Sequence, residues 1–296
     1  MSTSGSRPME PATAPAGDPQ ADGRGLGAAD QVRTVVAHGR RLRVSVRHGD
    51  GTRPALLLCN GIGSSLELLQ PFVDALDSGL EVIRFDLPGI GGSPPPVVPY
   101  HMSTLPALIG GMLTALGHDD PVDVLGMSWG GGLAQQLAFQ CRRRVRKLVL
   151  VATATGSLMV PARPNVLWKM LTPRRHRDPE YARRIAGEIY GGSMRTEPSV
   201  AARLLHASSR VGPQRGYYYQ LLAGLGWSSL PGLPLLRQPT LILAGNDDPL
   251  IPLVNARIMH TLLPNSELHV YDGGHLGLLT QADHFAGVVQ RFLHRP

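Results

Sequence analysis

Short apolar segments alternate with helical patterns along most of this chain of 296 residues. The apolar segments are rich in aliphatic and β-branched residues, as are strands buried on both faces of a parallel sheet. They span residues 55–59, 81–85, 122–127, 147–152, 240–244 and 267–271. Most of the intervening stretches place apolar residues three and four positions apart, as amphipathic helices do, at 66–76, 104–116, 131–139, 253–262 and 282–293. This alternation predicts an α/β fold, a mainly parallel sheet covered by helices, preceded by a hairpin at 33–37 and 42–47.

Two segments fall outside this alternation. Residues 1–30 are rich in Ser, Gly, Pro and Ala, so we expect a disordered tail before a single domain at 31–296. Roughly 85 residues without a strand-like run separate the strands predicted at 147–152 and 240–244, far more than an ordinary loop. We therefore expect an inserted helical lid at about 156–238. Its expected helices are at 166–171, 179–189 and 200–208, with an aromatic segment at 216–222.

The positive charge does not indicate a nucleic-acid partner. The formal net charge is +7, much of it from arginine clusters at 142–147 and 174–177. The first cluster leads directly into a predicted strand, which favours a solvated helix end where cations complement the helix dipole. Neither cluster comes with zinc-ligand spacing or an aromatic RNA-binding motif, so we predict no nucleic-acid binding. We also find no secretory signal and no apolar run that could span a bilayer, and expect an intracellular soluble protein.

Ser128 is the candidate nucleophile. It lies in the segment Gly-Met-Ser-Trp-Gly at 126–130, between a predicted strand and a predicted helix. A sharp strand-to-helix turn exposes a serine hydroxyl, and glycines on either side avoid collisions with the neighbouring strand and helix. The alternative is a turn serine with no chemical role.

A base and an orienting carboxylate follow Ser128 in the chain. A serine hydroxyl needs a histidine to take its proton, and the histidine needs an acid that fixes its tautomer. Asp247 and Asp248 follow one predicted strand and His275 follows the next, at the sheet edge where α/β proteins build their sites. Each residue alone has a structural alternative, a helix cap for the aspartates and a surface position for His275. Three such residues at three strand ends predict a catalytic triad that needs no metal and no organic cofactor.

Backbone amides are the expected oxyanion donors. One is the amide of Trp129, directly after the candidate nucleophile, and the other belongs to the loop Asn-Gly-Ile-Gly-Ser at 60–64. The glycines of this loop allow a tight turn, and we predict Ile62 as its donor. The same residues are also compatible with a plain strand-to-helix turn.

These residues together resemble the α/β-hydrolase superfamily, from about residue 31 to the end. The order Ser, Asp, His along the chain, the segment Phe-Asp-Leu-Pro-Gly-Ile-Gly-Gly-Ser at 85–93 and Gly-His at 274–275 all carry the likeness. The spacing from Gly245 to Asp248 and Pro252 matches the acid motif of the superfamily, which selects Asp248 over Asp247. The chain has Asn60 where many members have histidine, and a backbone donor site should tolerate that difference.

A narrower resemblance concerns the predicted lid. The segments 66–72, 126–131, 163–168, 189–192 and 216–227 are similar to those of the bacterial intracellular poly(3-hydroxyalkanoate) depolymerases that act on medium-chain-length polyesters. Lids vary widely on this fold, so a match there bears on the substrate. The resemblance implies a serine ester hydrolase that works through an acyl-enzyme on polyester storage granules in the cytoplasm, releasing 3-hydroxy acid monomers or oligomers.

An apolar polyester calls for an apolar binding groove. We predict substrate contacts from Trp168, Tyr217, Tyr218 and Trp227, although these aromatics could instead pack the lid onto the sheet. Three other functions stay open: a small-molecule carboxylesterase, a carbon–carbon bond hydrolase, and a granule-binding protein without catalytic activity. The oligomeric state is open as well.

Overall fold

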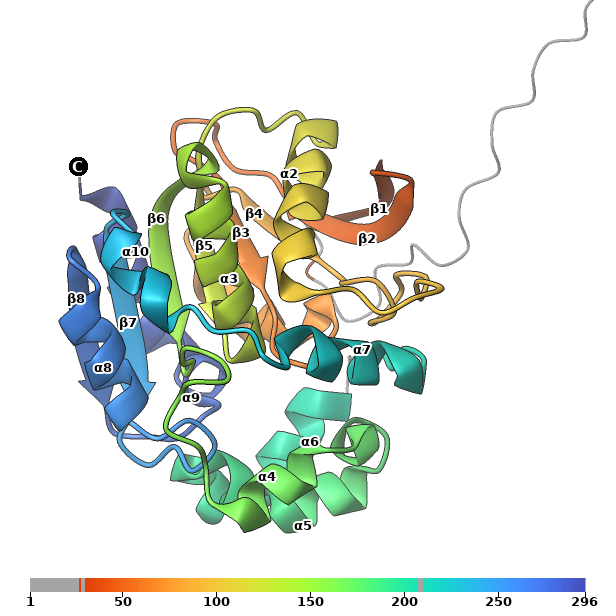
Figure 1. Cartoon of the computed structure of the whole chain (residues 1–296), viewed down its shortest axis with the longest axis vertical. Helices are drawn as coiled ribbons and strands as arrows, with labels where there is room; N and C mark the ends of the chain where they lie inside the picture. The colour runs from red at the N-terminus through yellow and green to blue at the C-terminus, as the bar shows by residue number, and fades with distance from the viewer. Residues whose placement is uncertain (1–26, 28–29, 207–209, 296) are drawn as a thin grey trace, which may run out of the picture.

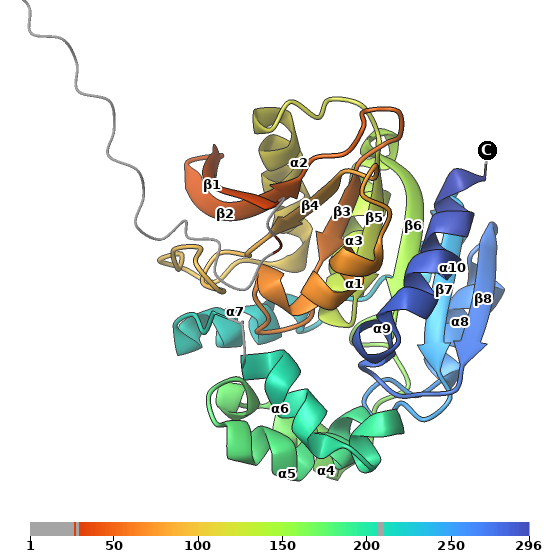
Figure 2. The same ribbon diagram turned by 180° about the vertical axis from the view of Figure 1, so that it is seen from behind.

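The computed structural model describes residues 27, 30–206 and 210–295, and their architecture is the predicted α/β fold. The predicted tail at 1–30 lies outside the described residues except for Gly27 and Asp30. Figures 1 and 2 show one central sheet with helices on both faces and a group of helices across one end. The strands are β1 (Asp30–Ala37), β2 (Arg40–Arg47), β3 (Leu56–Cys59), β4 (Val82–Phe85), β5 (Val122–Met127), β6 (Val145–Val151), β7 (Thr240–Gly245) and β8 (Ser266–Tyr271).

The eight strands form one sheet in the order β1-β2-β4-β3-β5-β6-β7-β8. The hairpin β1–β2 is antiparallel and joins β4 in antiparallel register, whereas every pair from β4 to β8 is parallel. The mainly parallel sheet is therefore confirmed. Parallel strands all end at the same edge, which brings the loops after β3, β5, β7 and β8 together.

Helices cover both faces because alternate side chains of the strands point to opposite sides. Leu57 and Cys59 of β3 belong to the core on one face, and Leu56 and Leu58 to the core on the other. On the first face lie α2 (Leu105–Ala115), α3 (Trp129–Gln140) and α8 (Val254–Leu262) (Figure 1). On the second lie α1 (Gln70–Ala75), α9 (Gly277–Thr280) and α10 (Ala282–His294) (Figure 2). Short 3₁₀ helices η1 (Leu66–Leu69), η2 (Met102–Thr104) and η3 (Arg142–Arg144) complete this part.

The inserted segment between β6 and β7 is helical. Its helices are α4 (Pro164–Met170), η4 (Pro173–His176), α5 (Pro179–Tyr190), η5 (Gly192–Arg195), α6 (Pro198–His206), α7 (Gln214–Gly224) and η6 (Leu230–Leu235). Residues 207 and 208 of the predicted third lid helix lie outside the described residues. In α5, the carboxylate of Asp178 caps the first turn by accepting from the Tyr181 amide at 2.9 Å. The buried side chains of α5 recur three and four residues apart, so this helix turns one apolar face toward its neighbours.

Candidate active site

Ser128 occupies the turn between β5 and α3 in a strained backbone conformation. Its φ is 55° and its ψ is −123°, a combination that a non-glycine residue adopts only where the surroundings impose it. The flanking glycines allow the close approach that this turn needs. A Cβ on Gly126 would lie 2.4 Å from the Gly130 carbonyl oxygen, and a Cβ on Gly130 would lie 2.1 Å from the Cys59 carbonyl oxygen. The serine is thereby presented at the sheet edge.

The structure brings Ser128, His275 and Asp248 together in a chain of hydrogen bonds. His275 Nε2 lies 3.0 Å from Ser128 Oγ, and His275 Nδ1 lies 2.8 Å from Asp248 Oδ2. The second oxygen of Asp248 accepts from the amides of Leu250 and Ile251, both at 2.9 Å. A carboxylate with these partners holds the imidazole with Nδ1 protonated and leaves Nε2 free to accept from the serine.

The neighbouring aspartate is engaged elsewhere. Asp247 forms an ion pair with Arg195 at 2.7 Å and accepts from the Gly192 amide at the same distance. Asp247 therefore ties the lid to the loop after β7, whereas Asp248 faces the histidine.

A lid residue, Tyr190, also positions His275. The amide of His275 donates to the Tyr190 carbonyl oxygen at 2.7 Å, and the two rings stack with their centroids 6.1 Å apart. His275 is only 3% exposed, so the imidazole has little freedom to turn away from Ser128. Sequence reasoning did not single out Tyr190, because helical periodicity identifies a buried lid residue but not its partner across the fold.

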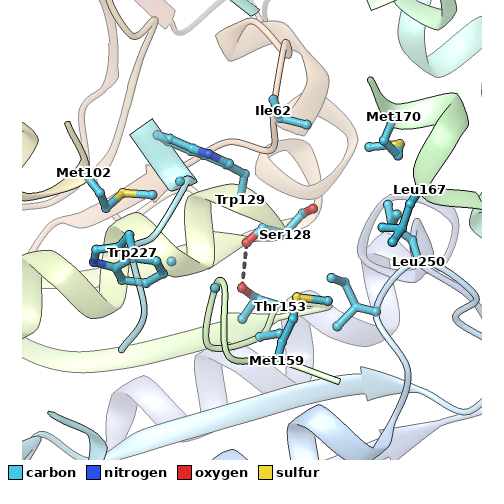
Figure 3. A pocket seen from close by; sticks show the side chains of 15 residues that line it. Ile62, Met102, Ser128, Trp129, Thr153, Met159, Leu167, Met170, Trp227 and Leu250 are labelled. Atoms are coloured by element: carbon cyan, nitrogen blue, oxygen red, sulfur yellow. Dashed lines mark hydrogen bonds between the residues drawn. The ribbon is translucent and has the colours of Figure 1, made fainter. Parts of the chain in front are cut away.

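Trp129 lies next to Ser128 and Ile62 lies above both in Figure 3, and all three line one cavity. Trp129 is the first residue of α3, so its amide has no carbonyl partner within the helix. Within the described residues, neither backbone amide donates to another protein group. The side chain of Asn60 is occupied in holding this loop, where its Nδ2 donates to the Ser65 carbonyl oxygen at 2.8 Å. Asn60 thus contacts neither of the two candidate donor amides through this side-chain group.

Gln220 of α7 connects the lid to the loop of Ile62 and to Trp129. Its side-chain oxygen accepts from the Gly63 amide at 2.7 Å, and its backbone carbonyl accepts from Trp129 Nε1 at 3.0 Å. Gln220 is almost completely buried. The loop that carries Ile62 is therefore held against the lid by this one side chain, a contact that the sequence did not indicate.

An apolar cavity of about 220 Å³ opens beside Ser128. It lies between the sheet edge and the lid, and its described lining contains no charged residue (Figure 3). Aliphatic and aromatic side chains form most of its wall, among them Met102, Met159, Leu167, Met170, Trp227 and Leu250. The cavity is suited to an uncharged aliphatic group next to the nucleophile.

Of the four aromatic residues predicted to contact substrate, only Trp227 lines this cavity. Tyr217 is buried inside the lid, where its hydroxyl donates to the Met170 carbonyl oxygen and accepts from Arg175. Trp168 and Tyr218 point to the surface, with 76% and 40% of their area exposed. Tyr217 therefore packs within the lid, which was the alternative to a substrate contact. Its buried hydroxyl forms hydrogen bonds with polar groups of the lid, as buried tyrosines usually do.

A second, smaller cavity of about 30 Å³ also borders Ser128. Ser128, Ile62, Met170 and Leu250 line both cavities, so the two meet at the serine. The second differs in character because His275, Tyr190, Arg175 and His176 also line it. The candidate site thus has one apolar compartment and a smaller one, called the polar cavity below, whose wall also carries these polar side chains.

The described part of the chain contains no group of three or more His, Cys, Asp or Glu side chains that could hold a metal ion. Its helices, searched over the same residues, include none long and apolar enough to cross a membrane.

Comparison with known proteins places this site in a family. Residues 54–282 match the model of the α/β-hydrolase fold family. This chain belongs to the α/β-hydrolase family. Among the relatives of this α/β-hydrolase is a poly(3-hydroxyalkanoate) depolymerase of Ectopseudomonas oleovorans, 49% identical over 264 residues, which cover 89% of this chain and 92% of the relative.

More distant members of the family differ in the reaction their names describe. A 2-hydroxy-6-oxononadienedioate/2-hydroxy-6-oxononatrienedioate hydrolase of Burkholderia vietnamiensis is 32% identical over 88% of this α/β-hydrolase and 94% of the relative. The crystal structure of an enol-lactonase from Burkholderia xenovorans superposes with a TM-score of 0.76 at 23% identity, over 88% of this chain and all of that one. At that identity the likeness shows the fold alone.

Proposed function

We propose that this chain is an intracellular serine ester hydrolase that cleaves medium-chain-length poly(3-hydroxyalkanoate) to 3-hydroxy acids. One observation carries the proposal: the hydrogen-bonded chain from Asp248 through His275 to Ser128 opens onto an apolar cavity. The relative at 49% identity, which covers nearly the whole chain, supports the choice of substrate.

The reaction begins when Ser128 Oγ attacks the ester carbonyl while His275 Nε2 takes its proton. Asp248 stabilises the imidazolium, and the amides of Ile62 and Trp129 bind the oxyanion. The ester C–O bond breaks, the leaving oxygen receives the proton from His275, and an acyl-enzyme on Ser128 remains. Water then attacks the acyl carbon while His275 takes its proton. The tetrahedral intermediate that forms breaks its bond to Ser128 Oγ, which releases the acid, and His275 returns the proton to Ser128.

The surroundings of the cavity fit a polymer with aliphatic side chains. Leu158, Trp168 and Leu225 are at least half exposed, although large apolar side chains gain by burial. Each is adjacent in sequence to a residue of the cavity wall, namely Met159, Leu167 and Gly224. These three exposed residues, which we call the apolar rim, would contact the surface of a storage granule while one chain enters the cavity.

Two enzymatic alternatives share this scaffold, a small-molecule carboxylesterase and a carbon–carbon bond hydrolase. Both would use the same triad, so the substrate has to separate them. A granule-binding protein without activity is less compatible with a serine, a histidine and an aspartate held at 3.0 and 2.8 Å. Labelling by a fluorophosphonate separates an enzyme from a binding protein, because only an activated serine reacts readily.

The deciding experiment incubates purified protein with granules of medium-chain-length polyester and measures released 3-hydroxy acids. Hydrolysis of p-nitrophenyl esters is measured in parallel, with Ser128→Ala as the control. We expect acid release by the wild type and none by the variant. Cleavage of p-nitrophenyl esters without release from granules would instead identify a general esterase.

A further inference from the structure

The polar cavity beside Ser128 contains a buried arginine whose charge is not neutralised by an acid. Arg175 is 2% exposed, and within the described residues no carboxylate forms an ion pair with it. One of its terminal nitrogens donates to the Tyr217 hydroxyl at 2.8 Å, and its Nε has no partner. A guanidinium stays charged at any physiological pH, and burying it without a carboxylate to balance the charge is unfavourable. An anionic group of a bound ligand would balance the charge of Arg175.

Its neighbour His176 adds a second unused polar atom. His176 is 5% exposed, and its Nε2 has no hydrogen-bond partner among the described residues. Burial, and then the positive charge of Arg175, hold the pKa of His176 well below its usual range. The imidazole is therefore neutral at pH 7, and Arg175 carries the positive charge of this cavity.

Tyr217 holds the guanidinium in place. Its hydroxyl accepts from Arg175 and donates to the Met170 carbonyl oxygen at 2.5 Å, while Met170 lines both cavities. The arginine thus has a fixed position near the nucleophile instead of a free surface position. A preorganised guanidinium is the protein group best suited to a carboxylate.

The cavity lies on the side from which His275 protonates the leaving group. His275 lines the polar cavity but not the apolar one. When the last ester bond of a 3-hydroxyalkanoate chain breaks, the leaving group is a 3-hydroxy acid whose carboxymethyl arm begins at the carbon bearing the leaving oxygen. The polar cavity is much smaller than the apolar one, about 30 Å³ against 220 Å³, so it suits a short polar arm better than an alkyl chain.

We propose that Arg175 binds the free carboxylate at the carboxyl end of the polyester, so that the enzyme removes monomers successively from that end. This inference rests on the proposed function. Breaking the ester C–O bond frees one 3-hydroxy acid and leaves the remaining chain as an acyl group on Ser128. Water then releases that chain with a new terminal carboxylate, which regenerates the group that Arg175 recognises.

The test compares the dimer of (R)-3-hydroxyoctanoic acid as its free acid and as its methyl ester. The two differ only in the group that Arg175 would meet. For the wild type we expect kcat/KM to be higher for the free acid by about 10- to 100-fold, the effect of a hydrogen bond to a charged group. Arg175→Gln should bring the ratio of the two kcat/KM values close to one.

Arg177→Gln is the matched control. Arg177 lies two residues further along and is exposed, so its substitution removes the same charge outside the cavity and should leave the ratio at the wild-type value. Tyr217→Phe keeps the ring but removes the hydroxyl that holds the guanidinium, and we expect a partial loss of the preference. This second variant also keeps the test decisive if Arg175→Gln does not fold.

The wild type alone can overturn the inference. Equal kcat/KM values for acid and methyl ester, together with release of 3-hydroxy acids from granules, would reject the role of Arg175 and leave the proposed function intact. Hydrolysis of p-nitrophenyl octanoate without cleavage of either dimer or of granules would reject both. A preference for the acid that persists in Arg175→Gln would assign carboxylate recognition to another group.

Discussion

The side-chain oxygen of Gln220 accepts a hydrogen bond from the Gly63 amide at 2.7 Å, which joins lid helix α7 to the loop of the candidate oxyanion donor Ile62. This contact links two segments that are 157 residues apart. The position of the Ile62 amide therefore depends on the lid, and the lid contributes to the proposed chemistry as well as to the cavity.

Replacing Gln220 should slow the chemical step more than it weakens binding. Gln220→Ala removes the acceptor for the Gly63 amide, so the Ile62 amide loses its fixed direction. We expect kcat for p-nitrophenyl octanoate to fall by about 10-fold, part of what loss of an oxyanion donor costs, with little change in KM. Gln214→Ala on the exposed side of the same helix is the control. A rise in KM with constant kcat would contradict this role.

Ser128→Ala should abolish ester hydrolysis while the protein stays folded. Without Oγ there is no acyl-enzyme, and we expect kcat to fall by at least about 10⁴-fold. Circular dichroism should show wild-type structure, and labelling by a fluorophosphonate should disappear. Turnover near the wild-type rate in this variant would exclude Ser128 as the nucleophile.

The apolar rim should matter for granules more than for soluble esters. Trp168→Ala removes a side chain that is 76% exposed, so the free energy of unfolding should change by less than about 0.5 kcal/mol. We expect the ratio of acid release from granules to hydrolysis of p-nitrophenyl octanoate to fall by about 5-fold, because less apolar area contacts the polymer. Val36→Ala removes an exposed apolar side chain on β1 and should leave this ratio unchanged. An equal effect of both substitutions would contradict a specific role for the rim.

A buried ionic network beside the site should make stability depend on pH. Arg43 lies between Glu67 at 2.6 Å and Asp86 at 3.1 Å, and all three are buried. Burial, followed by the charge of Glu67, raises the pKa of Asp86 to about 6. Because this pKa is above that of the unfolded chain, the contribution of Asp86 to stability is fully present below about pH 4 and is lost as the pH rises through 6.

Arg43→Met should therefore destabilise the protein most at alkaline pH. It leaves the buried carboxylate of Asp86 without its cation, whereas Glu67 keeps an ion pair with Arg210 at 3.7 Å, and we expect a loss of about 3–5 kcal/mol in the free energy of unfolding at pH 8. At pH 5 the loss should be smaller, since protonation of Asp86 removes its unpaired charge. Urea denaturation at the two pH values measures both quantities. The same loss at pH 5 and pH 8 would show that Asp86 does not titrate in the folded protein.

Much of the fold follows from local sequence patterns. The strands β5 and β8 lie within a residue of their predicted bounds, because aliphatic runs such as Val122–Met127 are typical of strands. The expectation that both strands are buried is wrong for β8, which is the last strand of the sheet and is mostly not buried. The segment predicted as one helix at 66–76 consists of η1 followed by α1, because Pro71 supports the start of a new helix and ends the preceding turn. The short helix α9 was not predicted, since four residues are too few for a periodicity.

The candidate triad could also be predicted, for a topological reason. Parallel strands bring their carboxyl ends to one edge, so residues in the loops after β5, β7 and β8 lie along the same edge of the sheet, and the loops decide which of them meet. Ser128, Asp248 and His275 each occupy such a position.

The lid is the part that the sequence alone did not decide. Its helices have no sheet to order them, so their amphipathic faces indicate burial but not the partner. Tyr217 is one example, predicted to contact substrate but found to hold Arg175. By itself the sequence determined the sheet, the strained serine turn and the three residues at the strand ends, because these follow from local pattern and strand direction. Only tertiary packing decided that Gln220 and Arg175 lie beside Ser128, because the lid's position over the sheet depends on contacts between residues far apart in the chain.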